Sequence, residues 1–173
     1  MTIGEILDRK FDIGDTVVHP QHGVGYVAGL EEKQFEPNAP RLYYVIAIPD
    51  TTLWVPVDST VSSGLRKLCV RSELDQCRQV LQSAPNALTP DRDLLAGLAG
   101  RIKQGTIIAH CEVVRDLTAH ARHKSLYGPT ADFQRIILNV LCQEWALVEG
   151  ISQAEASHEI SVLLKNGRTT HKQ

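Results

Sequence analysis

Histidine and cysteine side chains are the groups in this chain that could do acid–base, nucleophilic or metal chemistry. The densest group lies in one predicted helix, where His110 and Cys111 precede His120 and His123. About three helical turns separate the first histidine from the other two, so the imidazoles cannot converge on one ion. We therefore predict no metal site.

Four cysteines are scattered through the chain without a C-x-x-C pair, at Cys69, Cys77, Cys111 and Cys142. This spacing predicts buried thiols in a reducing compartment and argues against a disulfide framework. Glycine-rich phosphate loops, G-x-S-x-G elbows and paired nucleophiles and bases are also missing from the sequence. We expect no catalytic residues, no cofactor and no enzymatic activity.

Two further histidines lie in the segment V-V-H-P-Q-H-G, from Val17 to Gly23. Pro20 and Gly23 bracket a turn and predict a hairpin between two short strands. His19 and His22 would then lie in the turn and hydrogen-bond its backbone. An acid–base or metal role has no second cluster of ligands to support it.

Composition excludes several classes of protein. The 173 residues carry a formal net charge of -2, with 22% charged and 43% hydrophobic residues. This balance excludes a wholly disordered chain and a nonspecific nucleic-acid binder with a global basic field. No apolar run reaches the roughly 18 residues of a membrane-spanning helix, and the first residues lack a signal pattern. We expect a cytoplasmic protein that does not bind membranes.

The pattern of apolar residues divides the chain into two parts. Residues 12–68 contain short β-rich segments between turn formers, including T-V-V-H and T-L-W-V-P-V-D. Four or five such strands predict a small antiparallel barrel. Residues 71–165 have helical periodicity and predict a bundle of about five helices, at 72–84, 89–105, 106–124, 130–150 and 152–167. The predicted fold class is α+β.

Capping residues set the expected helix ends. Ser72 is the predicted N-cap of the first helix, and Thr89 with Pro90 is expected to begin the second. Gly150 ends the fourth helix, and Ser152 with Glu155 forms a capping box for the fifth. Trp145 is in register with the apolar stripe and is predicted to lie in the core. The short connection near Leu68 and Cys69 is expected to bring the two parts into contact.

A specific ordered motif runs through the first part of the chain. It reads G-D-x-V-V-x-P-x-H-G-V-G from Gly14, then V-P-V-D from Val55, then G-L-R from Gly64. Together with E-V-V-R-D-L and E-W-A-L-V-E-G in the helical part, this pattern resembles the CarD-like (CdnL) bacterial transcription regulators. Their N-terminal module is shared with transcription-repair coupling factors. The resemblance implies a Tudor-like barrel that docks on the β subunit of RNA polymerase and a helical domain that touches promoter DNA.

The candidate docking surface includes Trp54. Side chains alternate in T-L-W-V-P-V, so Leu53, Val55 and Val57 share one face while Trp54 and Pro56 share the other. An outward tryptophan is often an interface anchor, because it buries a large apolar area at low entropic cost. The alternative is that Trp54 packs under a loop or against the helices. By the resemblance, Lys33 and Trp54 occupy positions where relatives contact polymerase, so the expected polymerase-binding residues are Lys33, Trp54 and Pro56.

The resemblance is weaker in the helical part. Relatives carry a minor-groove tryptophan that would align with Pro90-Asp91-Arg92, and a basic helix start that would align with T-A-D at 130–132. Residues 71–165 hold ten lysines and arginines against eleven aspartates and glutamates. We therefore expect a weak contact with promoter DNA that depends on polymerase, because phosphate binding needs local positive charge. The remaining candidates for this contact, each also compatible with a solvated helix face, are Arg92, Arg101, Lys103, Arg122, His123 and Lys124.

Three functional hypotheses follow. The first is a monomeric transcription regulator that bridges polymerase and promoter DNA and modulates initiation. The second is a polymerase-binding adaptor whose helical domain binds another protein. The third is an unrelated small-barrel interaction module.

Overall fold

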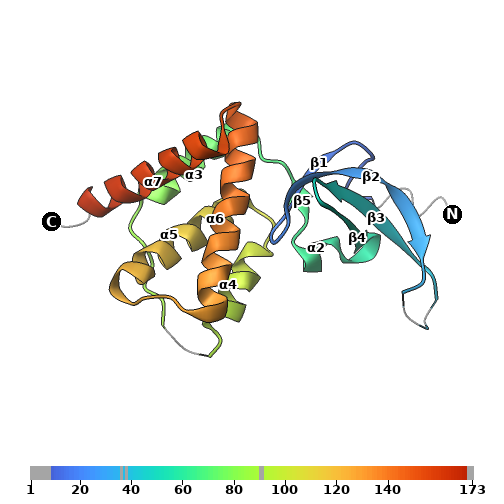
Figure 1. Cartoon of the computed structure of the whole chain (residues 1–173), viewed down its shortest axis with the longest axis horizontal. Coiled ribbons are helices and arrows are strands. Elements are labelled where there is room, and N and C mark those ends of the chain that lie inside the picture. Colours follow the sequence, from blue (N-terminus) through green and yellow to red (C-terminus); the bar gives the residue numbers. More distant parts are fainter. Residues whose placement is uncertain (1–8, 36, 38, 90–91, 171–173) are drawn as a thin grey trace.

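The computed structural model describes residues 9–35, 37, 39–89 and 92–170. Figure 1 shows a sheet and a group of helices lying side by side, with α6 (Gly128–Glu149) close to the β1–β2 end of the sheet. The predicted α+β class is confirmed. Pro90, where the second helix was predicted to begin, and Asp91 lie outside the described residues.

Five antiparallel strands form the sheet, in the order β4-β3-β2-β1-β5. Their bounds are β1 Thr16–His19, β2 Gly23–Lys33, β3 Arg41–Ile48, β4 Thr51–Pro56 and β5 Arg66–Lys67. Alternation places Val17, Tyr44 and Val55 in a buried core on one face. The short strands predicted from the alternation of apolar residues are confirmed.

The five strands form an open sheet, which is consistent with the expected Tudor-like unit. Within the described part of the chain, β4 and β5 lie at opposite edges and do not pair with each other. A 3-10 turn, η1 (Val57–Ser59), and the short helix α2 (Thr60–Ser63) occupy the chain between these strands. The remaining strand, β5, has two residues. This is too little extended chain to complete a hydrogen-bonded ring.

The β1–β2 turn has the predicted form. Gly23 follows it with a φ of +88°, a conformation that glycine adopts without steric cost. The backbone N–H of Gln21 donates a hydrogen bond to Nδ1 of His19 over 3.2 Å. His19 therefore does stabilise the turn backbone, as the sequence predicted.

Five helices follow the sheet. Their bounds are α3 Arg71–Gln82, α4 Leu94–Ile102, α5 Ile107–His123, α6 Gly128–Glu149 and α7 Gln153–Thr170. The predicted stop at Gly150 is confirmed, since its φ is +71°. The predicted capping box is also present: Ser152 N donates to Glu155, and Glu155 N donates to Ser152 Oγ. Trp145 is fully buried, as predicted.

Several helix starts differ from the sequence prediction, and α6 begins at Gly128, two residues before the predicted start at residue 130. Helix α3 begins at Arg71, one residue before the predicted cap, because Glu73 accepts a hydrogen bond from the Val70 N–H and so caps the earlier position. Helix α4 begins at Leu94 instead of Pro90. Its apolar stripe starts only there, and Leu98 and Ile102 continue it into the core. Burial, which the local capping pattern does not report, decides where this helix begins.

All four cysteines are free and buried, as predicted. Burial raises the pKa of Cys69, Cys111 and Cys142, so these thiols stay protonated at neutral pH.

A buried ion pair joins the sheet to the helices. Both Nη atoms of Arg66, on β5, donate to the carboxylate of Glu144, on α6, each over 2.6 Å. The same carboxylate accepts the Cys69 backbone N–H over 2.9 Å, which confirms that Cys69 lies at the contact. Burial alone would lower the pKa of Arg66, but its bonds to Glu144 outweigh this and raise the pKa.

A second contact lies beside the ion pair. Gln143 on α6 accepts a hydrogen bond from the Val24 N–H over 3.2 Å, at the start of β2. A Cβ atom at Gly23 would collide with the Gln143 side chain. Gly23 therefore serves both the turn and the close approach of α6 to the sheet.

Replacing Glu144 with alanine should leave the Arg66 charge buried without its partner. We expect the free energy of unfolding to fall by about 3–5 kcal/mol, measured by urea denaturation. Asp58→Ala is the matched control, because it removes an equally direct but exposed pair with Arg41, at 2.7 Å. It should cost less than about 1 kcal/mol. Equal losses in the two variants would show that burial does not set the strength of the Arg66–Glu144 pair.

Candidate functional site

The outer face of β4 carries the predicted docking tryptophan. Val55 is buried and Leu53 and Val57 pack against the sheet core, whereas Trp54 is 38% exposed. The outward orientation that alternation predicts for Trp54 is therefore confirmed. Pro56, two residues along, shares this outer face and lies opposite Tyr43 of β3.

Charged neighbours from β2 hold the Trp54 ring in place. The Nζ atom of Lys33 lies 4.0 Å from the centroid of the indole ring, in a cation–π arrangement. The indole Nε1 donates to Glu31 over 3.0 Å, and Lys33 pairs with the same carboxylate over 3.2 Å. The hydrogen bond from Trp54 and that from Lys33 lower the pKa of Glu31, which keeps it ionised. The predicted pair Lys33 and Trp54 is thus brought together.

Phe35 belongs to this surface and was missed by the sequence analysis. Its ring is 60% exposed and lies 6.3 Å from Trp54 and 5.1 Å from Tyr43, edge to face in both cases. Glu31, Lys33 and Phe35 alternate in the sequence, and this period of two was the signal that could have found the third residue. We call Glu31, Lys33, Phe35, Trp54 and Pro56 the aromatic patch.

Arg101 has a structural role that the sequence did not reveal. Its Nη2 atom lies 3.1 Å from the fully buried carboxylate of Asp116. Arg115 binds the same carboxylate over 2.8 Å, and the Asn86 N–H donates to it over 2.9 Å. Because its charge is already paired inside the α4–α5 contact, Arg101 is a poor candidate for binding phosphate.

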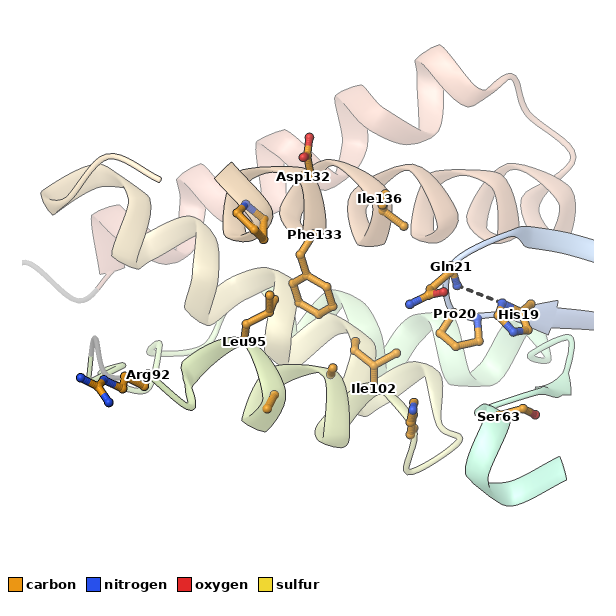
Figure 2. Close-up of a pocket in the computed structure, with 14 residues that line it drawn as sticks. His19, Pro20, Gln21, Ser63, Arg92, Leu95, Ile102, Asp132, Phe133 and Ile136 are labelled. Carbon is orange, nitrogen blue, oxygen red and sulfur yellow. Dashed lines mark hydrogen bonds between the residues drawn. The ribbon is translucent and has the colours of Figure 1, made fainter. Parts of the chain in front are cut away.

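Arg92 and Lys103 lie at a common groove of about 850 Å³ between α4, α6 and the β1–β2 turn. Figure 2 shows its apolar wall, with Leu95, Ile102 and Phe133 facing inward and Arg92 at one end. Both cations are exposed. Of the three predicted cations in and near α4, Arg92 and Lys103 are therefore available to a ligand, whereas Arg101 is paired with Asp116.

His19 also lines this groove but carries no charge at neutral pH. Burial, and then the nearby His22 and Lys103, lower the pKa of His19 to about 4. His19 therefore adds no positive charge to that of Arg92 and Lys103 in the groove.

The other predicted cations lie at the end of α5. Arg122, His123 and Lys124 are exposed there. Arg122 donates to the Leu164 carbonyl of α7 over 3.4 Å and lines a separate hollow with Arg168. The candidate DNA-binding cations thus divide into three places instead of forming one stripe.

Comparison with known families gives a match in each half of the chain. Residues 11–69 match the CarD-like/TRCF RID domain, and residues 98–161 match the CarD C-terminal domain. The chain belongs to the CarD-like family. The family is one of transcription regulators, and its N-terminal domain interacts with RNA polymerase. Both halves of the resemblance seen in the sequence are confirmed.

A relative in Bacillus subtilis (strain 168) is similar in sequence to this chain over most of its length. It is the "Putative transcription factor YdeB", 29% identical over 148 residues, which cover 84% of this chain and 96% of the relative. Among the described residues of our CarD-like chain, none of the helices could cross a membrane. A group of three or more histidines, cysteines and carboxylates fit to hold a metal is likewise not found in the described ranges.

The different roles of Arg101 and Lys103 can be tested by stability. Arg101→Ala removes one partner of the buried Asp116 carboxylate and should lower the free energy of unfolding by about 1.5–3 kcal/mol. Lys103→Ala, two residues away and exposed, should change it by less than about 0.5 kcal/mol. Urea denaturation of both variants measures the difference. If Arg101→Ala leaves the free energy of unfolding unchanged, the pair with Asp116 does not occupy Arg101, and Arg101 is again a candidate for binding phosphate.

Proposed function

We propose that residues 12–68 form a unit that binds the β subunit of RNA polymerase through the aromatic patch. The family match at residues 11–69 supports an interaction with polymerase. The observation that carries the choice of surface is the exposed cluster of Trp54 and Phe35 on the outer face of the sheet. Tryptophan is among the residues enriched in the hot spots that dominate the binding energy of interfaces.

The aromatic patch is already organised before a partner arrives. Lys33 and Glu31 fix the orientation of the Trp54 ring from β2. A side chain that is held in its bound rotamer loses less conformational entropy on association. Lys33 and Glu31 also offer one charge of each sign at the edge of the patch, which favours a protein partner of mixed charge.

We further propose that residues 71–165 contact promoter DNA and modulate initiation by changing the lifetime of the open complex. Arg92 and Lys103 are the exposed cations at the groove between the two parts of the chain. Two phosphate contacts give weak affinity alone, but tethering by polymerase raises the effective concentration of DNA to roughly the millimolar range. The contact is then useful without being strong.

A polymerase-binding adaptor is the second candidate. The formal charge of the helical part and the T-A-D segment at 130–132 favour it, since both reduce attraction to phosphate. In that case the helical part would bind another protein. Fork-junction DNA titrated against the polymerase-bound protein separates the two candidates, because the adaptor gives no DNA-dependent change.

Trp54→Ala should weaken binding to RNA polymerase at least about tenfold, because truncation of an interface anchor typically costs about 2 kcal/mol or more. Surface plasmon resonance on immobilised core polymerase measures the dissociation constant. The control is Tyr127→Ala, which removes an exposed ring at the far end of α5 and should bind polymerase normally. Normal binding by Trp54→Ala would rule out the aromatic patch as the docking surface.

Reversing both groove cations, Arg92→Glu with Lys103→Glu, should reduce any DNA-dependent effect on open-complex lifetime. The salt slope should fall by up to about 0.9 per lost phosphate contact, while polymerase affinity without DNA stays unchanged. Lys10→Glu with Lys165→Glu makes the same change in net charge at exposed positions elsewhere and serves as the control. If both double variants weaken the effect equally, net charge and not the groove is responsible.

A further inference from the structure

We propose that Tyr127 is a stacking surface for an unpaired base of promoter DNA, with neighbouring cations of α5 binding the adjacent phosphates. This inference rests on the proposed DNA contact of the helical part and assigns a new residue and a new chemistry to it. The aromatic ring and the cations belong to the connection between α5 and α6.

Tyr127 has an unusual exposure for its size. Its side chain is 79% exposed, more than any other large apolar or aromatic side chain in the described ranges. Leu126 immediately before it packs against the helical core. Gly128 after it begins α6 with a φ of +53°, and Pro129 lies in the first turn of that helix. The packing of Leu126 and the start of α6 therefore set the position of the backbone that carries the ring.

The segment around Tyr127 has a local positive charge that the totals conceal. Residues 117–131 contain Arg122, Lys124 and two histidines but no aspartate or glutamate, in a chain of net charge -2. The side chains of Arg122, His123 and Lys124 are exposed. The contact between Arg122 and the Leu164 carbonyl leaves the guanidinium charge without a carboxylate partner at that contact.

Helix polarity explains part of this pattern. Cations at the end of α5 interact favourably with the negative end of the helix dipole. That stabilisation does not require an exposed aromatic ring beside them. An exposed ring close in sequence to exposed cations, in the stretch 117–131 that contains no carboxylate, matches the way in which proteins bind single-stranded nucleic acid, where bases stack on rings and phosphates bind cations.

The position of the connection agrees with a DNA contact. Pro129, two residues after Tyr127, lines the same groove as Arg92. Figure 1 shows the α5–α6 connection and the start of α4 at the same lower end of the helices. One strand could therefore pass from Arg92 to Tyr127. The aromatic patch differs in kind, since Glu31 there would repel phosphates and suits a protein partner.

The test uses the full chain and two labelled DNA probes of equal length at about 50 mM salt. One probe is a fully paired duplex, and the other is a fork with an unpaired overhang. Tyr127→Ala should raise the dissociation constant for the fork about 5-fold to 100-fold, since stacking contributes about 1–3 kcal/mol per base. Tyr127→Phe keeps the ring and should stay within about twofold of the wild type. Duplex affinity should be the same in all three proteins.

Tyr26→Ala provides the matched control, because Tyr26 is also an exposed tyrosine but lies on the sheet. It should bind both probes like the wild type. If the wild type binds the fork and Tyr127→Ala binds it equally well, the stacking proposal is wrong and the DNA contact stands. A wild type that prefers neither probe over the other also overturns the stacking proposal. If the wild type binds neither probe, alone or when bound to RNA polymerase, the proposed DNA contact is wrong and the stacking proposal falls with it.

Discussion

The buried pair between Arg66 and Glu144 is the constraint on which the arrangement of this molecule depends. It joins β5 to α6, two elements 78 residues apart in the chain, and its carboxylate also accepts the Cys69 N–H. A buried charge without its partner is strongly destabilising, so the sheet cannot separate from the helices without a large cost. Gln143, one residue before Glu144, accepts a hydrogen bond from the Val24 N–H at the start of β2. The two parts of the chain are therefore held in a defined relative position.

Because the sheet and the helices keep a fixed relative position, a partner bound to one of them sets the direction in which the other faces. The aromatic patch lies on the outer face of the sheet, while Arg92, Lys103 and Tyr127 lie on the helices. A protein docked by the patch would present the helical surface in a limited set of directions. Rigid presentation allows weak phosphate and stacking contacts to act together, because their orientation is set before DNA binds. The proposed function thus needs no strongly basic domain.

The parts of the structure that follow local rules could be predicted from the sequence. Alternation placed Trp54 outward, helical periodicity placed Trp145 in the core, and turn residues located the β1–β2 hairpin. Interactions between distant residues could not be predicted in this way. Nothing near Glu144 in the sequence indicates Arg66 as its partner, and Arg101 was taken as a free cation because the burial of Asp116 was unknown. The open edges of the sheet and the start of α4 could not be predicted for the same reason, since both depend on packing and not on local signals.

The most direct test of the central claim is a structure of this protein bound to RNA polymerase on a melted promoter, determined by electron cryomicroscopy. The account predicts that Trp54 and Phe35 lie against the β subunit. It also predicts that Arg92, Lys103 and Tyr127 face DNA at the edge of the melted region, with the Arg66–Glu144 pair intact. A complex in which the aromatic patch faces solvent, or in which the helices rest on protein away from DNA, would contradict it.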